Sequence, residues 1–464
     1  MPLPAPVQAY LASEQVTYDV TEVTLSNGNR SQAAPSSSIA TLILLEDDLG
    51  MAQVLVPKAS LLDLTALNQS FGRNWRASKQ NEKAANDDEN DTPSLSALPI
   101  LQDGLLLVEQ HLLKLDPIYL ESGETGIYIK LNQKDFGRLT HRALVDRYCR
   151  PLKALIQATL NEEDDLLQIH NAVENFTTRR IKSRLNETLE IPPLPHIVEK
   201  IIRLRIDPNA KTSELSDVVV QDPGLSAQIV SWAASPFYAA PGKIRSVEDA
   251  VIRVLGFELV VNLAIGLAVG KTLQLPDDHP YNQGPYWQQA ITTATVMERL
   301  SRLHPSKGRP ARGLAYLSGL LNNFGYLIIG HTFPPHFSLM CRLVEANPHV
   351  PGTYIDQHLF GMTRDQMSSC LFQSWSLPEE VTRAVRWQQM PGYQGPYSNY
   401  ANLLCLSHLL INEAQCKPNS CLMTPHQTDI LYERLGINPE EARGIVEQVL
   451  ISQEDLKGFG RGFD

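Results

Sequence analysis

The chain has 464 residues, of which 43% are hydrophobic and 20% charged, with 40 Lys and Arg against 51 Asp and Glu and a formal net charge of −11. These proportions exclude collagen-like, coiled-coil and wholly disordered chains, and the length corresponds to two or three domains of roughly 150 residues each. The acidic balance argues against a role dominated by polyanion binding, because phosphate contacts need clustered cations. Nucleic acid is therefore not an expected partner.

The cysteine count and the apolar runs indicate a cellular compartment. Six cysteines without a C-x-x-C pair are too few for a disulfide framework and are typical of reduced thiols. The start of the chain lacks the basic and apolar segments of a signal peptide. The longest apolar run, residues 259–270, is shorter than the roughly 20 residues that span a bilayer. We therefore expect a cytoplasmic protein without membrane insertion.

Residues 1–142 have the pattern of a mixed α/β domain. Alternating and continuous apolar runs predict strands, and apolar residues at helical spacing predict helices. In chain order we expect a helix at 6–11, a strand at 18–23, a hairpin of 39–45 and 51–56, a helix at 61–67, a flexible polar loop at 78–96 and a strand at 126–131.

Residues 143–185 are predicted to form a helical connector. They carry an acidic cluster at 162–165 and then a basic cluster of Arg179, Arg180, Lys182 and Arg184. Four cations within six residues have the chemistry to grip phosphate. Short charged runs are more often a solvated helix end, and we adopt that interpretation.

From residue 191 the pattern becomes helical. The segment 191–195 holds three prolines, which remove backbone donors and fix φ, so it is expected to be extended. Ile197, Ile201 and Leu204 then form an apolar stripe at helical spacing. Helix-boundary residues follow at Ser213, Asp222-Pro223, Ser246-Val247-Glu248-Asp249 and Gly256. Helices are expected to continue to about residue 456, before a loose glycine-rich tail.

Several motifs occur here in a recognisable order: Pro192-Pro193-Leu194-Pro195, Gln221-Asp222-Pro223-Gly224-Leu225-Ser226, Ser235-Pro236-Phe237-Tyr238, Val254-Leu255-Gly256, Trp287 and Trp375-Ser376-Leu377-Pro378. This order resembles the HDOD domain family over about residues 190–395. The resemblance implies an all-α bundle related to the HD and HD-GYP metal-dependent phosphohydrolases. It also implies a place in bacterial signalling, in a family that in general lacks a demonstrated hydrolase activity.

The HD pattern would place metal ligands at six positions of this chain. Phosphoester hydrolysis of this type needs a divalent metal that activates water, and imidazoles and carboxylates are its usual ligands. Amides carry no charge to offset the cation, and an arginine repels it. We therefore expect no metal or other cofactor. The residues that stand at these positions are Gln289, Asn322, Asn323, Arg364, Gln388 and Gln389.

What remains is a set of polar side chains with two interpretations. Interior amides usually hydrogen-bond one another, which would close the site. The alternative is a polar pocket for a small ligand such as a nucleotide.

The first 140 residues are similar to the YbaK/prolyl-tRNA-synthetase-associated domain, a family of aminoacyl-tRNA deacylases. The likeness lies in residues 7–11, 39–45, 54–57 and 61–64. In that family a lysine preceding the buried strand is important for editing, and an ammonium there can stabilise an oxyanion. Here the corresponding residue is Ala40, which implies that deacylation is lost. Lys58 is the candidate substitute, but lysines are mostly exposed, and we interpret it as a surface residue.

A second candidate metal site is a group of close cysteines and histidines. Structural zinc sites bring their ligands in tight pairs, and only Cys405 with His408 and Cys416 with Cys421 come near that spacing. We interpret Cys405 as a core residue instead. The complete group is Cys405, His408, Cys416, Cys421 and His426.

Together these patterns predict an α+β multidomain chain. The expected parts are a YbaK-like deacylase domain at 1–142, a helical connector at 143–185, an all-α HDOD bundle at 186–395 and C-terminal helices packed on it at 396–464. The leading hypothesis is a catalytically silent bacterial signalling scaffold that binds a protein partner or a small ligand. One alternative is an aminoacyl-tRNA editing deacylase, with tRNA as its partner. The other is a metal-dependent phosphodiesterase of the HD type.

Overall fold

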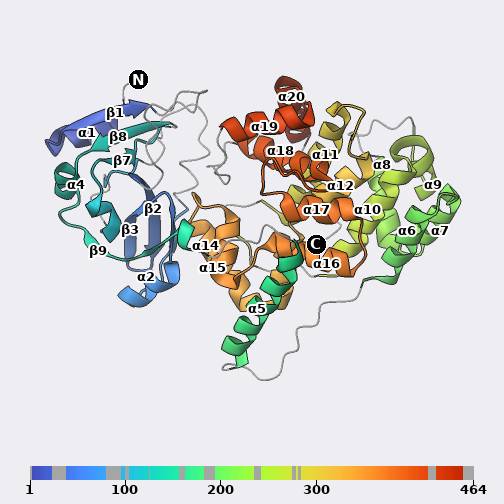
Figure 1. Cartoon of the computed structure of the whole chain (residues 1–464), viewed down its shortest axis with the longest axis horizontal. Coiled ribbons are helices and arrows are strands. Elements are labelled where there is room, and N and C mark those ends of the chain that lie inside the picture. Colours follow the sequence, from blue (N-terminus) through green and yellow to red (C-terminus); the bar gives the residue numbers. More distant parts are fainter. Residues whose placement is uncertain are drawn as a thin grey trace.

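The computed structural model describes residues 3–22, 38–79, 96–99, 104–124, 126–155, 162–181, 194–234, 242–273, 278–280, 284–415 and 425–452. A mixed sheet with short helices lies at one end of the molecule, and a bundle of helices lies at the other (Figure 1). Helices α14 (Pro334–Ala346) and α15 (Gly352–Phe360) lie between them. This agrees with the expected mixed α/β first part and helical second part.

The sheet has the strand order β1-β8-β7-β2-β3-β6-β9, with β5 (Arg76–Ala77) paired to β2. Neighbouring strands are antiparallel except for the pairs β2–β7, β3–β6 and β6–β9, which are parallel. The strands on the main path are β1 (Tyr18–Glu22), β2 (Ile39–Asp47), β3 (Gly50–Pro57), β6 (Leu105–Glu109), β7 (Ile118–Glu121), β8 (Ile127–Leu131) and β9 (Leu144–Asp146).

Both faces of the central strands are covered, which explains the continuous apolar run at 39–45. Ala40 and Leu55 pack in a core beneath the domain's own helices α1 (Ala5–Ser13) and α4 (Gln133–Leu139). Ile43 and Leu45 belong instead to a larger core that continues into the helical bundle. The sheet domain and the helical bundle therefore share this larger core, while the smaller core belongs to the sheet domain alone.

The predicted helix at 6–11, the strand at 126–131 and the hairpin are confirmed, and the strand at 18–23 is confirmed over residues 18–22, since residue 23 lies outside the described residues. The predicted helix at 61–67 is only partly right, because β4 (Ser60–Leu62) comes first and α2 begins at Leu64. The Asp63 side chain fixes this boundary by accepting from the Ala66 N–H at 3.0 Å. Of the predicted loop at 78–96, residues 80–95 lie outside the described residues, and Ser78 and Ser96 are buried.

The predicted helical connector starts too early in the sequence. Residues 144–146 form β9 beside β6, and β10 (Cys149–Pro151) pairs with β4. A buried carboxylate causes this: Glu109 Oε2 accepts from the N–H groups of Tyr148 and Cys149, at 2.6 and 2.9 Å. The sheet domain thus extends past residue 142, and the connector is helical only in α5 (Glu162–Ile181).

All described regular structure beyond residue 194 is helical. Asp222 caps α8 and Ser246 caps α9, as predicted, whereas Ser213 lies inside α7 and does not cap it. The helices, besides α14 and α15, are α6 (His196–Ile206), α7 (Thr212–Val220), α8 (Pro223–Ala233), α9 (Val247–Ala250), the π-helical turn Val251–Leu255, α10 (Phe257–Gly270), α11 (Tyr286–Leu303), α12 (Arg312–Leu320), α13 (Phe324–Thr332), α16 (Arg364–Ser374), α17 (Glu379–Trp387), α18 (Ser398–Ala414), α19 (Pro425–Leu435) and α20 (Pro439–Ile451). Among the described residues, no helix is both long and apolar enough to cross a bilayer.

Candidate functional site

The Asn322-Asn323 pair occupies the turn between α12 and α13. Two glycines hold this turn in the interior. A Cβ on Gly319 would lie 2.5 Å from the Ala294 Cα, and a Cβ on Gly325 would collide with the carbonyl of Arg364. Only glycine permits such a close approach of backbones. The sequence therefore places the turn against α11 on one side and α16 on the other.

Gln388, at the end of α17, lies at the centre of a buried hydrogen-bond network. Its Nε2 donates to the Asn322 carbonyl and to Asp365 Oδ1, both at 2.8 Å. Its Oε1 accepts from His408 Nε2 at 3.0 Å. Burial lowers the pKa of His408 to about 4, so the ring is neutral at pH 7 and carries its proton on Nε2. This one amide ties α16 and α18 to the turn at Asn322.

Arg364 lies beside this network and is paired within the fold. Its Nε and its backbone N–H donate to Asp356 Oδ2 at 2.9 and 3.1 Å. The positive charge of Arg364 is therefore already matched by Asp356. The neighbouring Asp365 is also buried, and burial raises its pKa to about 7, with a further increase from the Asp356 carboxylate.

The remaining two predicted positions lie apart from this network. Gln289, in the first turn of α11, donates from Nε2 to the carbonyl of Gly284 just before its own helix. Gln389 is exposed after the end of α17. The structure thus links Asn322 directly to Gln388, and it places Asn323 and Arg364 next to members of the same network.

The donors here do not fit a divalent metal. Within the described part of the chain, no group of three or more His, Cys, Asp or Glu side chains is placed to hold one. Of the cysteine and histidine group, Cys405 is buried in the core and His408 bonds Gln388. Cys416 and Cys421 lie outside the described residues, as does the His426 side chain.

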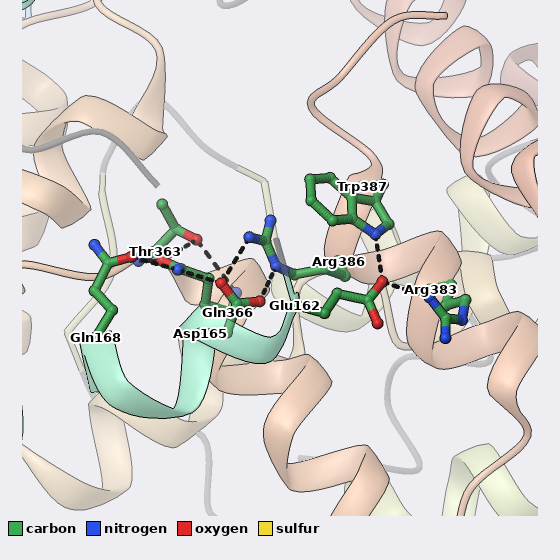
Figure 2. Close-up of polar contacts among 8 residues, drawn as sticks. All are labelled: Glu162, Asp165, Gln168, Thr363, Gln366, Arg383, Arg386 and Trp387. Carbon is green, nitrogen blue, oxygen red and sulfur yellow. Dashed lines mark hydrogen bonds and ion pairs between the residues drawn. The ribbon is translucent and has the colours of Figure 1, made fainter. Parts of the chain in front are cut away.

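Sequence reasoning missed the role of the acidic cluster at 162–165, part of which anchors α5 to the bundle. Arg386 Nη2 donates to Asp165 Oδ1 at 2.8 Å and Arg386 Nε donates to Asp165 Oδ2, so the pair is bidentate, and both side chains are 4% exposed (Figure 2). Glu162 Oε1 accepts from Arg383 Nη1 at 2.8 Å and from the Trp387 indole N–H at 2.6 Å. The available signal was the spacing of three residues between the two carboxylates, which places them on one helix face.

Gln366 completes the attachment of α5 (Figure 2). Its Nε2 donates to Asp165 Oδ1 and to Gln168 Oε1, both at 2.8 Å, and its Oε1 accepts from the N–H and the hydroxyl of Thr363. All four hydrogen-bonding positions of this buried amide are used. Of the basic cluster, Lys182 and Arg184 and the side chains of Arg179 and Arg180 lie outside the described residues.

The predicted editing position lies in the sheet domain. Ala40 is fully buried in β2 and stands opposite Pro57 of β3. The next residue, Lys58, is not the exposed lysine that we expected, since its side chain is 21% exposed and its Nζ lies 2.7 Å from Glu121 Oε1. Thr41 donates to the other oxygen of Glu121 at 2.6 Å. The ammonium is therefore paired with a carboxylate.

Known proteins resemble this chain over its whole length or over its helical half. The HDOD domain family model matches residues 191–391. A crystal structure of a "Putative signal transduction protein" from Marinobacter aquaeolei VT8 is 36% identical, covers 100% of both chains and has a TM-score of 0.85. An HDOD domain protein of unknown function from Geobacter sulfurreducens is 21% identical over 64% of this chain and 98% of its own, with a TM-score of 0.49.

One curated relative, an uncharacterised protein of Treponema pallidum (strain Nichols), is 24% identical over 217 residues. The match covers 46% of this chain and 40% of that relative's length.

Proposed function

We propose that this chain, whose residues 191–391 form an HDOD domain, is a bacterial regulatory protein that acts by binding another molecule and not by hydrolysing a phosphoester. One observation carries this proposal. The Gln388 amide, which the HD pattern predicts to stand at a metal-ligand position, makes three internal hydrogen bonds with Asn322, Asp365 and His408. Three of the four hydrogen-bonding positions of this amide are used within the fold, and its oxygen, uncharged and already accepting from His408, is a poor ligand for a metal ion.

The charges around this amide support the same conclusion. A metal site needs carboxylates or imidazoles that are free to ligate. Here Asp356 is bonded to Arg364, and His408 already uses its Nε2 toward Gln388. The pKa of Asp365 is raised to about 7, which disfavours the anion that a cation would require. A regulatory role also fits the name given to the Marinobacter protein, which is similar over the full chain.

Phosphoesterase assays test this proposal. The purified full chain would be incubated with a chromogenic phosphodiester and with cyclic dinucleotides, each with added Mn²⁺, Fe²⁺ or Mg²⁺. We expect no turnover above that of the metal ions without protein. Metal-dependent turnover by the unchanged chain would overturn the proposal.

A second candidate function rests on Lys58. It directly follows Pro57, which pairs with Ala40, the position where a YbaK-like deacylase is expected to hold its lysine. This is the observation that favours aminoacyl-tRNA editing by the sheet domain. The contact with Glu121 weighs against it, because a paired ammonium stabilises an oxyanion less well. Deacylation of a mischarged tRNA that is lost on Lys58→Ala would establish this function.

A further inference from the structure

We propose that α5 is a detachable strap and that the surface beneath it is a docking site for an acidic helix of a partner protein. We call this surface the α17 docking face and define it by Arg383, Arg386 and Trp387. The inference rests on the proposed function, since a protein that acts by binding needs a surface for its partner. In this structure the chain's own α5 occupies that surface.

The chemistry of the docking face specifies its occupant. Arg383 and Arg386 lie three positions apart on α17, and they meet Glu162 and Asp165, which lie three positions apart on α5. The Trp387 indole N–H adds a third donor beside the first pair. A helix with carboxylates at positions i and i+3 is therefore the segment that these donors fit, and α5 is an internal copy of it.

Over the described side chains of residues 162 and 164–172, α5 is attached to the bundle mainly by polar contacts, which makes it exchangeable. Leu166 and Leu167 are 63% and 60% exposed and do not pack against the bundle. Within the same range Ile169 and Ala172 pack on the apolar core, the latter near Gly361. Exchanging one carboxylate helix for another costs little when both satisfy the same arginines, because no charge is left buried and unpaired.

The docking face is continuous with the buried amide network. Gln366, which holds Asp165, follows Asp365 directly on α16, and Arg386 lies two residues before Gln388 on α17. The positive charge of Arg386 also acts to lower the pKa of the Asp365 carboxyl. An occupant of the docking face therefore touches α17, which ends just before Gln388, and α16, which Gln388 ties to the Asn322 turn. This is the route by which binding can alter the interior of the domain.

Hydrogen–deuterium exchange on the full chain tests the strap. Asp165→Asn removes the charge that pairs with Arg386, and we expect exchange in α5 to rise by at least about tenfold while α10, α11 and α12 stay protected. Asp164→Asn is the matched control, because Asp164 is an exposed carboxylate on the same helix. Unchanged exchange of α5 in Asp165→Asn, or equal loss of protection across the bundle, would overturn the proposal.

A peptide with the sequence of residues 160–182 tests the docking face. We expect it to bind the full-length Glu162→Gln/Asp165→Asn variant at least about tenfold more tightly than the unchanged chain, where the tethered α5 competes at high effective concentration. Adding Arg383→Gln and Arg386→Gln should abolish binding, and a scrambled peptide should not bind. Absence of peptide binding to the opened variant, or binding that survives loss of both arginines, would contradict the inference.

The same experiments separate this inference from others. An unchanged chain that doubles its mass in light scattering, and returns to a monomer in Arg386→Gln, would assign the docking face to a second copy and overturn the assignment to a different protein. Failure of peptide binding would leave the proposed function intact, because that function is judged by phosphodiester turnover. Turnover would contradict the proposed function whatever the peptide does.

Discussion

Asn347 pairs with the backbone of Leu62 through both ends of its side-chain amide. Its Oδ1 accepts from the Leu62 N–H at 2.7 Å, and its Nδ2 donates to the Leu62 carbonyl at 3.1 Å. Asn347 follows α14 and is 1% exposed, whereas Leu62 ends β4 of the sheet domain. The helical half thus completes the hydrogen bonding of a strand that lies 285 residues earlier in the chain.

Replacing Asn347 by alanine should weaken this junction. The Leu62 N–H and carbonyl would be left buried without a partner, at a cost of about 1–3 kcal/mol for each group. We expect a lower urea midpoint and faster hydrogen exchange in β4. Asn399→Ala is the control, because Asn399 donates to the Gly308 carbonyl in an exposed contact and should cost less than about 1 kcal/mol. Equal effects of the two substitutions would contradict this role.

Gly319→Ala should destabilise the bundle at the contact between α11 and α12. A Cβ at Gly319 would lie 2.5 Å from the Ala294 Cα, where no flexible side chain can move aside. We expect a loss of about 1–3 kcal/mol in the free energy of unfolding. Gly444→Ala in α20 is the matched change: nothing lies within 4 Å of that Cβ, so alanine should stabilise by about 0.5–1 kcal/mol. Urea unfolding of both variants measures the difference in sign.

Gln388→Ala should destabilise the domain, because it deprives Asp365, His408 and the Asn322 carbonyl of a shared partner. Loss of a buried hydrogen-bonding group costs about 1–3 kcal/mol for each partner left unsatisfied. The exposed neighbour Gln389 provides the control, and Gln389→Ala should change stability by less than about 0.5 kcal/mol. If the two alanine variants unfold at the same urea concentration, the Gln388 network does not contribute to stability.

Asp365→Asn should change how stability depends on pH. The folded-state pKa of Asp365 is raised to about 7, so its contribution to stability is complete below the unfolded pKa of 3.8 and is lost as pH rises to 7. Asparagine does not ionise, so the variant should gain stability relative to the unchanged chain over that interval, by up to about 4 kcal/mol.

The histidines do not obscure this comparison. His349 and His408 have pKa values lowered to about 4, and their opposite pH dependence is common to both proteins and cancels in the difference. Urea midpoints at pH 5, 6, 7 and 8 provide the measurement. A difference that does not grow with pH would mean that Asp365 is ionised throughout.

Local sequence patterns predicted most helices and strands, because the interactions that form these elements join residues close together in the sequence. The apolar run at 39–45 and the capping residues Asp222 and Ser246 act within a few residues of their own backbone. Strands β9 and β10 escaped prediction for the opposite reason. Each has three residues, too few for a periodicity, and both depend on the distant carboxylate of Glu109.

The candidate site was predicted unevenly for a similar reason. Motif order located Asn322 and Gln388, but it could not reveal that Asp365 and His408 bond the same amide. The acidic residues of α5 were assigned no role, because their partners Arg383 and Arg386 lie more than 200 positions away in the sequence. Pairings of this length depend on the packed tertiary structure.

The central claim is that the amide-filled site binds no catalytic metal. The most direct test is the metal content of the full chain, purified without chelators or a metal affinity column and measured by mass spectrometry. We predict less than a tenth of an equivalent of Mn, Fe, Co, Ni or Zn. About one or two equivalents that disappear in Asn322→Ala or Gln388→Ala would contradict the account and restore the metal-dependent phosphodiesterase.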